Sequence, residues 1–316
     1  MRIAQYEQYG PADVIQIVDK DVPVVVGDND VCVDVIAVGI NPADTKMRRG
    51  RLPIQSFPAG IGREFAGVVS DLGKNVDHLV IGQAVIGTGE GVLRDQVVVD
   101  KDSVMAMPEG ITWDQAAVLP VAAQTAWKAV ESQDVQPGEV CVVSAAVGGV
   151  GLVICQLLVA KGATVIGSAS EWNHEYLEEA LGVIPITYGE GFAKRLEEAT
   201  PQGIHHVFDQ SGSEMIEAAL ELGVPREYIN SVSGMGPHYG VPTVGRVGLD
   251  PDSINALAKM LAEGDLTIPI RVFPMDEARK GFIHMEEVHD KGKVVIRLDS
   301  DPEDEMRAIR EALGGD

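Results

Sequence analysis

The stretch VCVVSAAVGGVGLVICQLLVAKGATVIGSAS, residues 140–170, reads as a strand, a glycine-rich turn, a helix and a second strand in one run. Residues 140–144 form the continuous apolar run that a parallel strand buried on both faces needs. Residues 152–160 continue apolar, and Gly162 supplies a stop before the β-branched run at 164–166. This order predicts a βαβ unit, the building block of a parallel α/β sheet.

The turn between the first strand and the helix has the pattern A-x-G-x-x-G. Small residues let the chain turn tightly, let backbone amides approach a pyrophosphate and let the helix begin close to the strand. The N-terminus of the helix then presents unpaired N–H groups and a partial positive charge to the phosphates. The pattern predicts a dinucleotide-binding turn made of Ala146, Val147, Gly148, Gly149, Val150 and Gly151.

Two other interpretations of this stretch are less favoured. Residues 140–160 are about as long as a membrane span requires, but three glycines, Ser144, Gln156 and an immediately following strand fit a buried α/β core better. A lone glycine-rich turn also occurs in α/β proteins that bind nothing there. Here the strand before the turn and the helix after it favour the nucleotide site.

The composition of the 316-residue chain indicates a globular protein of two domains, with 45% hydrophobic residues. Forty-eight acids against 25 bases give a net charge of -23, which disfavours nucleic acid as a partner. The N-terminal residues lack the apolar core of a secretory signal, so a cytoplasmic protein that does not use a membrane is expected. Only three cysteines occur, which excludes a four-thiolate zinc site.

The pattern of elements changes near residue 118. Short β-like runs separated by Gly, Pro and Asp precede that point, and strand-helix alternation follows to about residue 247. The last block, with a helix at 254–262, a strand at 268–272, a helix at 275–289 and a strand at 293–298, is too short to fold alone and is expected to complete the N-terminal domain. The tail at 302–313 is predicted as a surface helix. The expected domains are therefore 1–120 with 248–316, and 121–247.

Five segments, in this order, resemble the medium-chain dehydrogenase/reductase superfamily, in its zinc-independent NADPH:quinone oxidoreductase (zeta-crystallin-like) branch. The resemblance covers nearly the whole chain and implies an α/β fold, with a Rossmann doubly wound parallel-sheet cofactor domain and a β-rich GroES-like catalytic domain. The segments are AVGINPADTKMRRG (37–50), GREFAGVV (62–69), LPVAAQTAW (119–127), AAVGGVG (145–151) and GKVVIRL (292–298).

Asn41 and Arg63 stand where zinc-dependent relatives have a cysteine and a histidine, so the resemblance implies that no zinc is bound. Alkoxide chemistry on a simple alcohol depends on a Lewis-acid metal. Without that metal, a quinone or an activated alkene that accepts hydride is the more plausible substrate. The implied function is hydride transfer from NADPH to a small-molecule quinone or enone, in a homodimer. An enoyl or alkenal double-bond reductase and a non-catalytic NADPH-binding protein, a sensor or crystallin-like partner, are the alternatives.

The resemblance also implies roles for polar residues. Asn41 and Asp44 are expected beside the nicotinamide and the substrate, Lys46 as the group that orients substrate oxygen or donates a proton, and Thr125 as a hydroxyl near the nicotinamide. Gly234 follows a predicted strand at the carboxyl edge of the sheet, where ligands bind. Each of these residues also has a purely structural alternative. Asn41 and Asp44 would cap a turn and a helix, Lys46 would be an exposed lysine, and Thr125 would be a threonine in the interior of a helix.

The choice between NADPH and NADH depends on the end of the second strand. NAD-specific folds commonly place an acid there, and this chain has Ala169 instead. Residues at positions where the family approaches the adenosine phosphate favour NADPH, but residues 162–193 contain no lysine or arginine to meet that phosphate. NADPH is preferred and NADH stays possible. The residues at the positions where the family approaches the adenosine phosphate are Ser168, Ser170, Asn173 and Tyr188.

Overall fold

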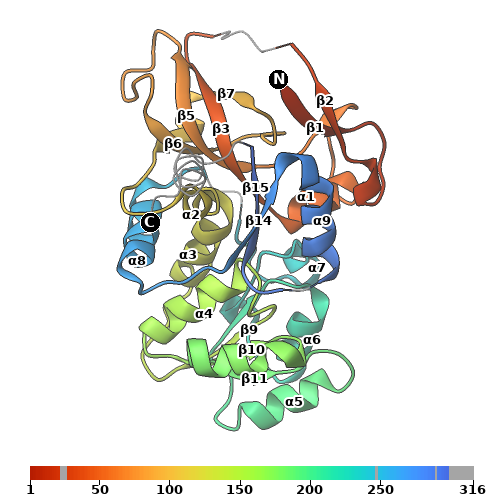
Figure 1. Cartoon of the computed structure of the whole chain (residues 1–316). Coiled ribbons are helices and arrows are strands. Elements are labelled where there is room, and N and C mark those ends of the chain that lie inside the picture. The colour runs from red at the N-terminus through yellow and green to blue at the C-terminus, as the bar shows by residue number, and fades with distance from the viewer. Residues whose placement is uncertain (22–26, 246–247, 289, 299–316) are drawn as a thin grey trace, which may run out of the picture. The chain divides into compact units, whose positions relative to one another are not determined.

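The chain divides into two compact units, each with its own core (Figure 1). The computed structural model describes residues 1–21, 27–245, 248–288 and 290–298. In that part of the chain, unit 1 comprises 1–120, 270–288 and 294–298, and unit 2 comprises 121–269 and 290–293.

Unit 1 is built mainly from antiparallel strands. β3 is central to its larger sheet, because it pairs antiparallel with three other strands. The order of that sheet is β14 (Ile270–Pro274), β15 (Lys293–Arg297), β3 (Asp30–Ile40), β5 (Glu64–Leu72), β6 (Ala84–Thr88) and β8 (Val104–Ala106), with β7 (Gln96–Asp100) beside β3. A smaller sheet contains β2 (Gln16–Asp19), β1 (Arg2–Tyr6) and β4 (Ala59–Gly60).

Three helices complete unit 1, namely α1 (Pro42–Arg48), α2 (Trp113–Ala116) and α9 (Ala278–Glu287). α1 and α9 lie against each other (Figure 1). The core collects the inward-facing strand residues, and Phe65 of β5 and Phe282 of α9 are completely buried in it. The C-terminal segments at 270–288 and 294–298 thus belong to unit 1.

Unit 2 contains a five-stranded parallel sheet. Its order is β11 (Ile184–Ile186), β10 (Thr164–Ser168), β9 (Val140–Val143), β12 (His206–Asp209) and β13 (Ile229–Ser231). Every residue of β9 is buried, as the apolar run predicts. The helices are α3 (Gln124–Glu131), α4 (Gly151–Ala160), α5 (Phe192–Ala199), α6 (Ser213–Glu221), α7 (Gly236–Tyr239) and α8 (Pro251–Glu263).

Helices cover both faces of this sheet. Val140 and Val142 of β9 pack in one cluster with residues of α5 and α6. The alternate residues, Cys141 and Val143, are equally buried, and α4 contacts the same strand and packs against α3. Because successive strand side chains point to opposite faces, α3 and α4 cover the second face. The predicted Rossmann doubly wound sheet and β-rich partner domain are confirmed.

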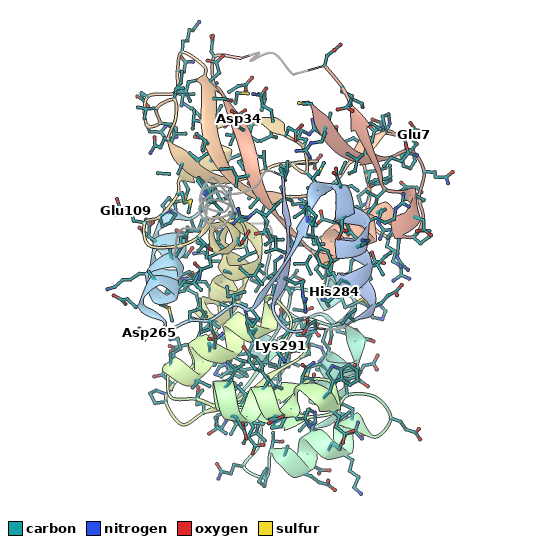
Figure 2. All side chains as sticks on the ribbon, viewed as in Figure 1. Glu7, Asp34, Glu109, Asp265, His284 and Lys291 are labelled. Carbon is teal, nitrogen blue, oxygen red and sulfur yellow. The ribbon has the colours of Figure 1, made fainter. Side chains whose placement is uncertain are left out.

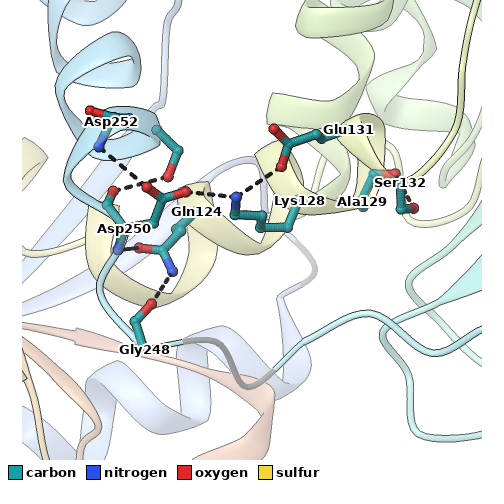
Figure 3. Close-up of polar contacts among 9 residues, drawn as sticks. Gln124, Lys128, Ala129, Glu131, Ser132, Gly248, Asp250 and Asp252 are labelled. Atoms are coloured by element: carbon teal, nitrogen blue, oxygen red, sulfur yellow. Dashed lines mark hydrogen bonds and ion pairs between the residues drawn. The ribbon is translucent and has the colours of Figure 1, made fainter.

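One boundary differs from the prediction, because residues 248–269 belong to unit 2 rather than to the N-terminal domain. The amide of Gln124 in α3 donates to Gly248 O at 2.7 Å and accepts from Asp250 N at 3.1 Å (Figure 3). Lys128, one turn later, pairs with the Asp250 carboxylate at 2.6 Å. These contacts fasten the start of α8 to α3. Hydrophobic periodicity does not predict polar contacts of this kind. The sequence therefore placed the domain boundary before residue 248.

Local elements differ in smaller ways. Within the strand-helix alternation of unit 2, a 3₁₀ turn at Glu171–Asn173 is followed by a π-helical turn at Tyr176–Ala180 in place of an α-helix. The predicted strand at 268–272 is observed at Ile270–Pro274. The predicted surface helix at 302–313 lies outside the described residues.

Many of the acidic residues lie on the surface. Figure 2 shows acids such as Glu7, Asp34 and Glu109 of unit 1 and Asp265 of unit 2, all of which are exposed. These carboxylates are hydrated, so they are compatible with the buried cores beneath them. Among the described residues, no helix combines the length and the hydropathy that a membrane span requires.

Candidate active site

The strand order of unit 2 marks one place on the sheet where ligands can enter. From β9 the chain crosses to β10 on one side, whereas β12 and β13 lie on the other side of β9. In open α/β sheets, ligands bind at such a switch point, in the crevice outside the carboxyl ends of the strands. The glycine-rich turn leaves the carboxyl end of β9 at this point. The predicted nucleotide turn therefore lies where a nucleotide is expected.

The turn itself is tightly held. Ala145 has a φ of 47°, which is uncommon for a residue with a side chain. Ala146 N donates to Ser168 O at 2.9 Å, and Gly148 N donates to Ala145 O at 2.9 Å. Gly292 N donates to Val147 O at 2.7 Å. These bonds fix the path of the turn before any ligand binds.

The three glycines of the turn serve different purposes. A Cβ on Gly151 would lie 2.3 Å from Ala145 O, so glycine is required there for α4 to begin against the strand. A Cβ on Gly149 would meet the Lys293 side chain at 2.4 Å. A Cβ on Gly148 would meet one atom within 4 Å, Ala145 O at 3.3 Å. A side chain at Gly148 would therefore need only a small shift of Ala145, far less than at Gly151, and the open space beside Gly148 is available to a pyrophosphate.

The start of α4 supplies donors for that space. Val150 precedes the helix, and the first N–H groups of any helix have no acceptor within it. With the helix dipole, these amides attract an anion. The residues present thus fit a dinucleotide.

The predicted residues at the ends of β10 and β11 are brought together. The hydroxyls of Ser170 and Tyr188 are 2.8 Å apart, although 18 positions separate them in the sequence. Asn173 N donates to Ser170 O at 2.9 Å, and Ser168 and Asn173 are buried. Because one of the two hydroxyls donates to the other, the remaining hydroxyl can donate to a ribose or to a phosphate carried by that ribose.

A buried acid connects the ends of three neighbouring strands. The completely buried Asp209 carboxylate accepts from the hydroxyls of Ser144 at 3.0 Å and Ser231 at 2.7 Å. It also accepts from Ser211 N at 3.1 Å and Gly212 N at 2.9 Å. These hydrogen bonds compensate the cost of burying the carboxylate. This network, which the sequence analysis missed, holds the carboxyl edge of β9, β12 and β13 in place; an Asp that ends an apolar strand was its only signal.

Two further predicted residues lie in unit 2. Gly234 has a φ of 89°, so it occupies a left-handed turn just after β13, and Met235 N donates to the Ser233 hydroxyl at 3.2 Å. Thr125 is the second residue of α3 and is half-buried. The roles of Gly234 and Thr125 near the nicotinamide remain proposals.

The predicted catalytic residues of unit 1 lie on α1 or at its start. The Asp44 carboxylate accepts from Asn41 N at 2.8 Å, which is the capping contact weighed as the structural alternative. The Asn41 amide donates to the buried Glu64 carboxylate at 2.8 Å. Lys46 is half-buried on the same helix. Asn41 and Asp44 are thus rigidly oriented, which suits both a structural and a positioning role.

Glu64 and Arg48 are two charged residues that the site prediction left out. Arg48 is completely buried, and its guanidinium pairs with Glu286 of α9 and donates to Gly10 O at 2.5 Å. Burial lowers the pKa of Arg48, and the Glu286 carboxylate acts in the opposite direction. The arginine of the resemblance motif therefore joins α1 to α9. Its place in the segment 37–50, two residues before Gly50, was the available signal.

The described residues contain no group of three or more His, Cys, Asp or Glu side chains arranged to hold a metal. Arg63, which the resemblance aligns with a histidine of zinc-dependent relatives, donates to the Met47 sulfur at 3.3 Å.

Comparison with known proteins agrees with the two-unit architecture. The alcohol dehydrogenase GroES-like domain model matches residues 27–109, and the zinc-binding dehydrogenase model matches residues 149–261. A quinone oxidoreductase of Salmonella typhimurium is 30% identical over 75% of this chain and 74% of its own length.

Two solved structures share the fold over almost their whole length. The quinone oxidoreductase of Coxiella burnetii is 28% identical, with a TM-score of 0.84 over 95% of this chain and 99% of that one. The Escherichia coli quinone oxidoreductase, solved with NADPH, is 24% identical, with a TM-score of 0.85 over 94% of this chain and all of that one. On these matches, the chain belongs to the quinone oxidoreductase branch of the medium-chain dehydrogenase/reductase superfamily.

Proposed function

We propose that this chain is a reductase that transfers hydride from NADPH to a quinone or to an activated alkene. The observation that carries the proposal is the turn at the switch point, where Gly151 is required by the fold and Gly148 leaves open space beside the first turn of α4. When bound, NADPH would supply the hydride. The protein has to hold the dinucleotide, shield the reaction and provide a proton.

We propose the following roles for the binding residues. The first amides of α4, with Ala146, Val147, Gly148, Gly149, Val150 and Gly151, hold the pyrophosphate. Ser168, Ser170, Asn173 and Tyr188 bind the adenosine ribose and its phosphate, and Thr125 and Gly234 lie toward the nicotinamide. In unit 1, Asn41 and Asp44 position the substrate, and Lys46 donates the proton to the reduced product.

The preference for NADPH over NADH is supported by Arg195. Its guanidinium donates to the carbonyls of Thr187 at 2.8 Å and of Tyr188 at 3.2 Å, and to those of Gly189 and Glu190. A positive charge is therefore held at the turn that carries Tyr188, just beyond the segment 162–193 that has none. One of the two hydroxyls beside it, that of Ser170 or of Tyr188, can donate to a 2′-phosphate.

We also propose that the active protein holds no zinc, because Asn41 and Arg63 replace the two ligand types, and that it is a cytoplasmic homodimer, as in its family. Metal analysis of active protein and its molar mass in solution test these points. One tightly held zinc needed for activity would contradict the first.

The deciding experiment measures steady-state oxidation of NADPH and NADH with a panel of quinones and enones. Acceptor-dependent turnover that is faster with NADPH is expected. Turnover with enones alone would favour the double-bond reductase, and tight binding without turnover would favour the non-catalytic alternative. Arg195→Met should weaken NADPH and leave NADH unchanged. A preference for NADH would show that the absence of lysine and arginine from residues 162–193 outweighs the family precedent.

A further inference from the structure

Gln210, the residue after β12, carries a buried side-chain amide with no hydrogen-bond partner. Both polar atoms, Nε2 and Oε1, are buried, and neither has a partner within the described residues. A buried polar group without a hydrogen bond costs about 1–3 kcal/mol of stability. Such an unpaired group in a folded protein calls for a physical explanation, and a ligand that binds it is one such explanation.

This condition separates Gln210 from the other amides of the described chain. The Asn230 Oδ1 atom is also buried and unpaired, but its Nδ2 donates to Ala129 O at 2.8 Å and to the Ser132 hydroxyl at 2.9 Å. Gln133 is buried with both ends of its amide in use. In the described ranges, Gln210 alone has an amide that is buried and unpaired at both ends.

Gln210 is located at the switch point of the parallel sheet. Its backbone N–H donates to the Ser144 hydroxyl at 2.7 Å, and Ser144 is the residue that joins β9 to the glycine-rich turn. Asp209, immediately before it, is held by the network that ties β9, β12 and β13. The backbone of Gln210 is therefore fixed between β9 and β12, where the fold places a nucleotide.

The free groups of the amide define what can satisfy it. Nε2 needs an acceptor and Oε1 needs a donor. A phosphate has acceptors only and would leave Oε1 unpaired. A ribose hydroxyl or a primary carboxamide offers both a donor and an acceptor. A dinucleotide carries ribose hydroxyls in both halves and a primary carboxamide in the nicotinamide half alone. The place of Gln210 at the switch point, between β9 and β12, favours the nicotinamide riboside half over the adenosine half.

We propose that Gln210 binds the nicotinamide riboside half of the cofactor, through a neutral group that donates and accepts at once. The inference rests on the proposed function and adds a residue that the family motifs do not name. Gln210 positions the ring for hydride transfer, since a hydrogen-bond pair fixes the orientation of the riboside as well as its place.

The test compares Gln210→Met with a matched control, Gln133→Met, because methionine keeps the length of the side chain and removes both polar atoms. Thermal unfolding is measured without ligand. Dissociation constants are measured for NADPH, for 2′-phospho-ADP-ribose, which lacks the ring, and for 2′,5′-ADP, which also lacks the second ribose.

Gln210→Met is expected to unfold at the same temperature as the wild type or higher, because an unsatisfied amide has been removed. It should bind NADPH about tenfold more weakly and 2′,5′-ADP unchanged. Weaker binding of 2′-phospho-ADP-ribose would identify the ribose hydroxyls as the group that Gln210 binds. Unchanged binding of this ligand would identify the carboxamide instead. Gln133→Met should show the reverse, a lower unfolding temperature and normal affinity for all three ligands.

Three results would overturn the inference: unchanged NADPH affinity in Gln210→Met, an equal loss for 2′,5′-ADP, or a lower unfolding temperature without any loss of affinity. A wild type that binds neither NADPH nor NADH would instead overturn the proposed function, and the inference with it.

Discussion

The two edges of the parallel sheet in unit 2 both carry buried polar networks, and only one of them is closed. At the amino edge, His206 begins β12, its Nδ1 is 2.9 Å from Gln133 Oε1 and its Nε2 is 3.0 Å from the Glu139 carboxylate. The other end of the Gln133 amide donates to Glu227 O at 3.2 Å. At the carboxyl edge, Asp209 is satisfied but Gln210, next to it, is not. A closed network contributes stability, whereas an open one leaves groups for a ligand.

The largest expected effects separate two glycines of the same turn. Gly151→Val should unfold unit 2, because its Cβ would meet the backbone at 2.3 Å. Gly148→Val should keep an unfolding temperature near that of the wild type and lose NADPH affinity by about a hundredfold or more, a loss of about 2.7 kcal/mol. Circular dichroism and calorimetric titration measure both. A folded Gly148→Val variant with normal affinity would remove the turn from the site.

A smaller effect is expected from opening the closed edge. Gln133→Met leaves the His206 Nδ1 and Glu227 O atoms without their partner, which should cost about 1–3 kcal/mol of unfolding free energy. Urea denaturation measures the loss. Equal stability of variant and wild type would show that this network contributes nothing, and the contrast between the edges would fail.

The closed edge should also depend on pH. The N–H of Gln136 is the main cause that holds the pKa of Glu139 below its ordinary value, and the His206 hydrogen bond adds to it. A carboxylate with a lowered folded pKa stabilises the protein above its unfolded pKa, about 4.3, and this contribution disappears as pH falls through the folded value. Glu139→Gln should therefore be less stable than the wild type at pH 7, by about 0.5–1 kcal/mol, and equally stable near pH 3. A difference that persists at pH 3 would exclude the charge as its cause.

The smallest effect is expected between the edges, in the core. Cys141 of β9 and Cys155 of α4 are completely buried, and burial raises the pKa of the Cys141 thiol to about 12 and that of Cys155 further in the same direction. A thiol reagent at pH 8 should thus modify neither cysteine in the folded protein, and both after denaturation. Fast labelling of either one in native protein would show that β9 and α4 are exposed by opening.

The open edge also shows how far the sequence alone leads. Apolar runs and the glycine spacing predict the sheet, the turn and the position of the ligand, because burial and steric limits are local in sequence. Ser170 and Tyr188 were each named from family position, and their hydroxyl–hydroxyl contact is seen only in the structure. Gln210 and the Asp209 network were not predicted, because their roles depend on which buried polar atoms form hydrogen bonds in the folded protein. The place of residues 248–269 was missed for the same reason.

Hydrogen exchange of wild-type backbone amides, with and without NADPH, tests the contrast between the edges most directly. Protection on binding is expected at the carboxyl edge, in residues 144–152, 168–173 and 209–212. The amino edge, at residues 133–140 and 205–206, should exchange at the same rate in both states. Protection at the amino edge alone, or none at the glycine-rich turn while NADPH is bound, would contradict the proposed site.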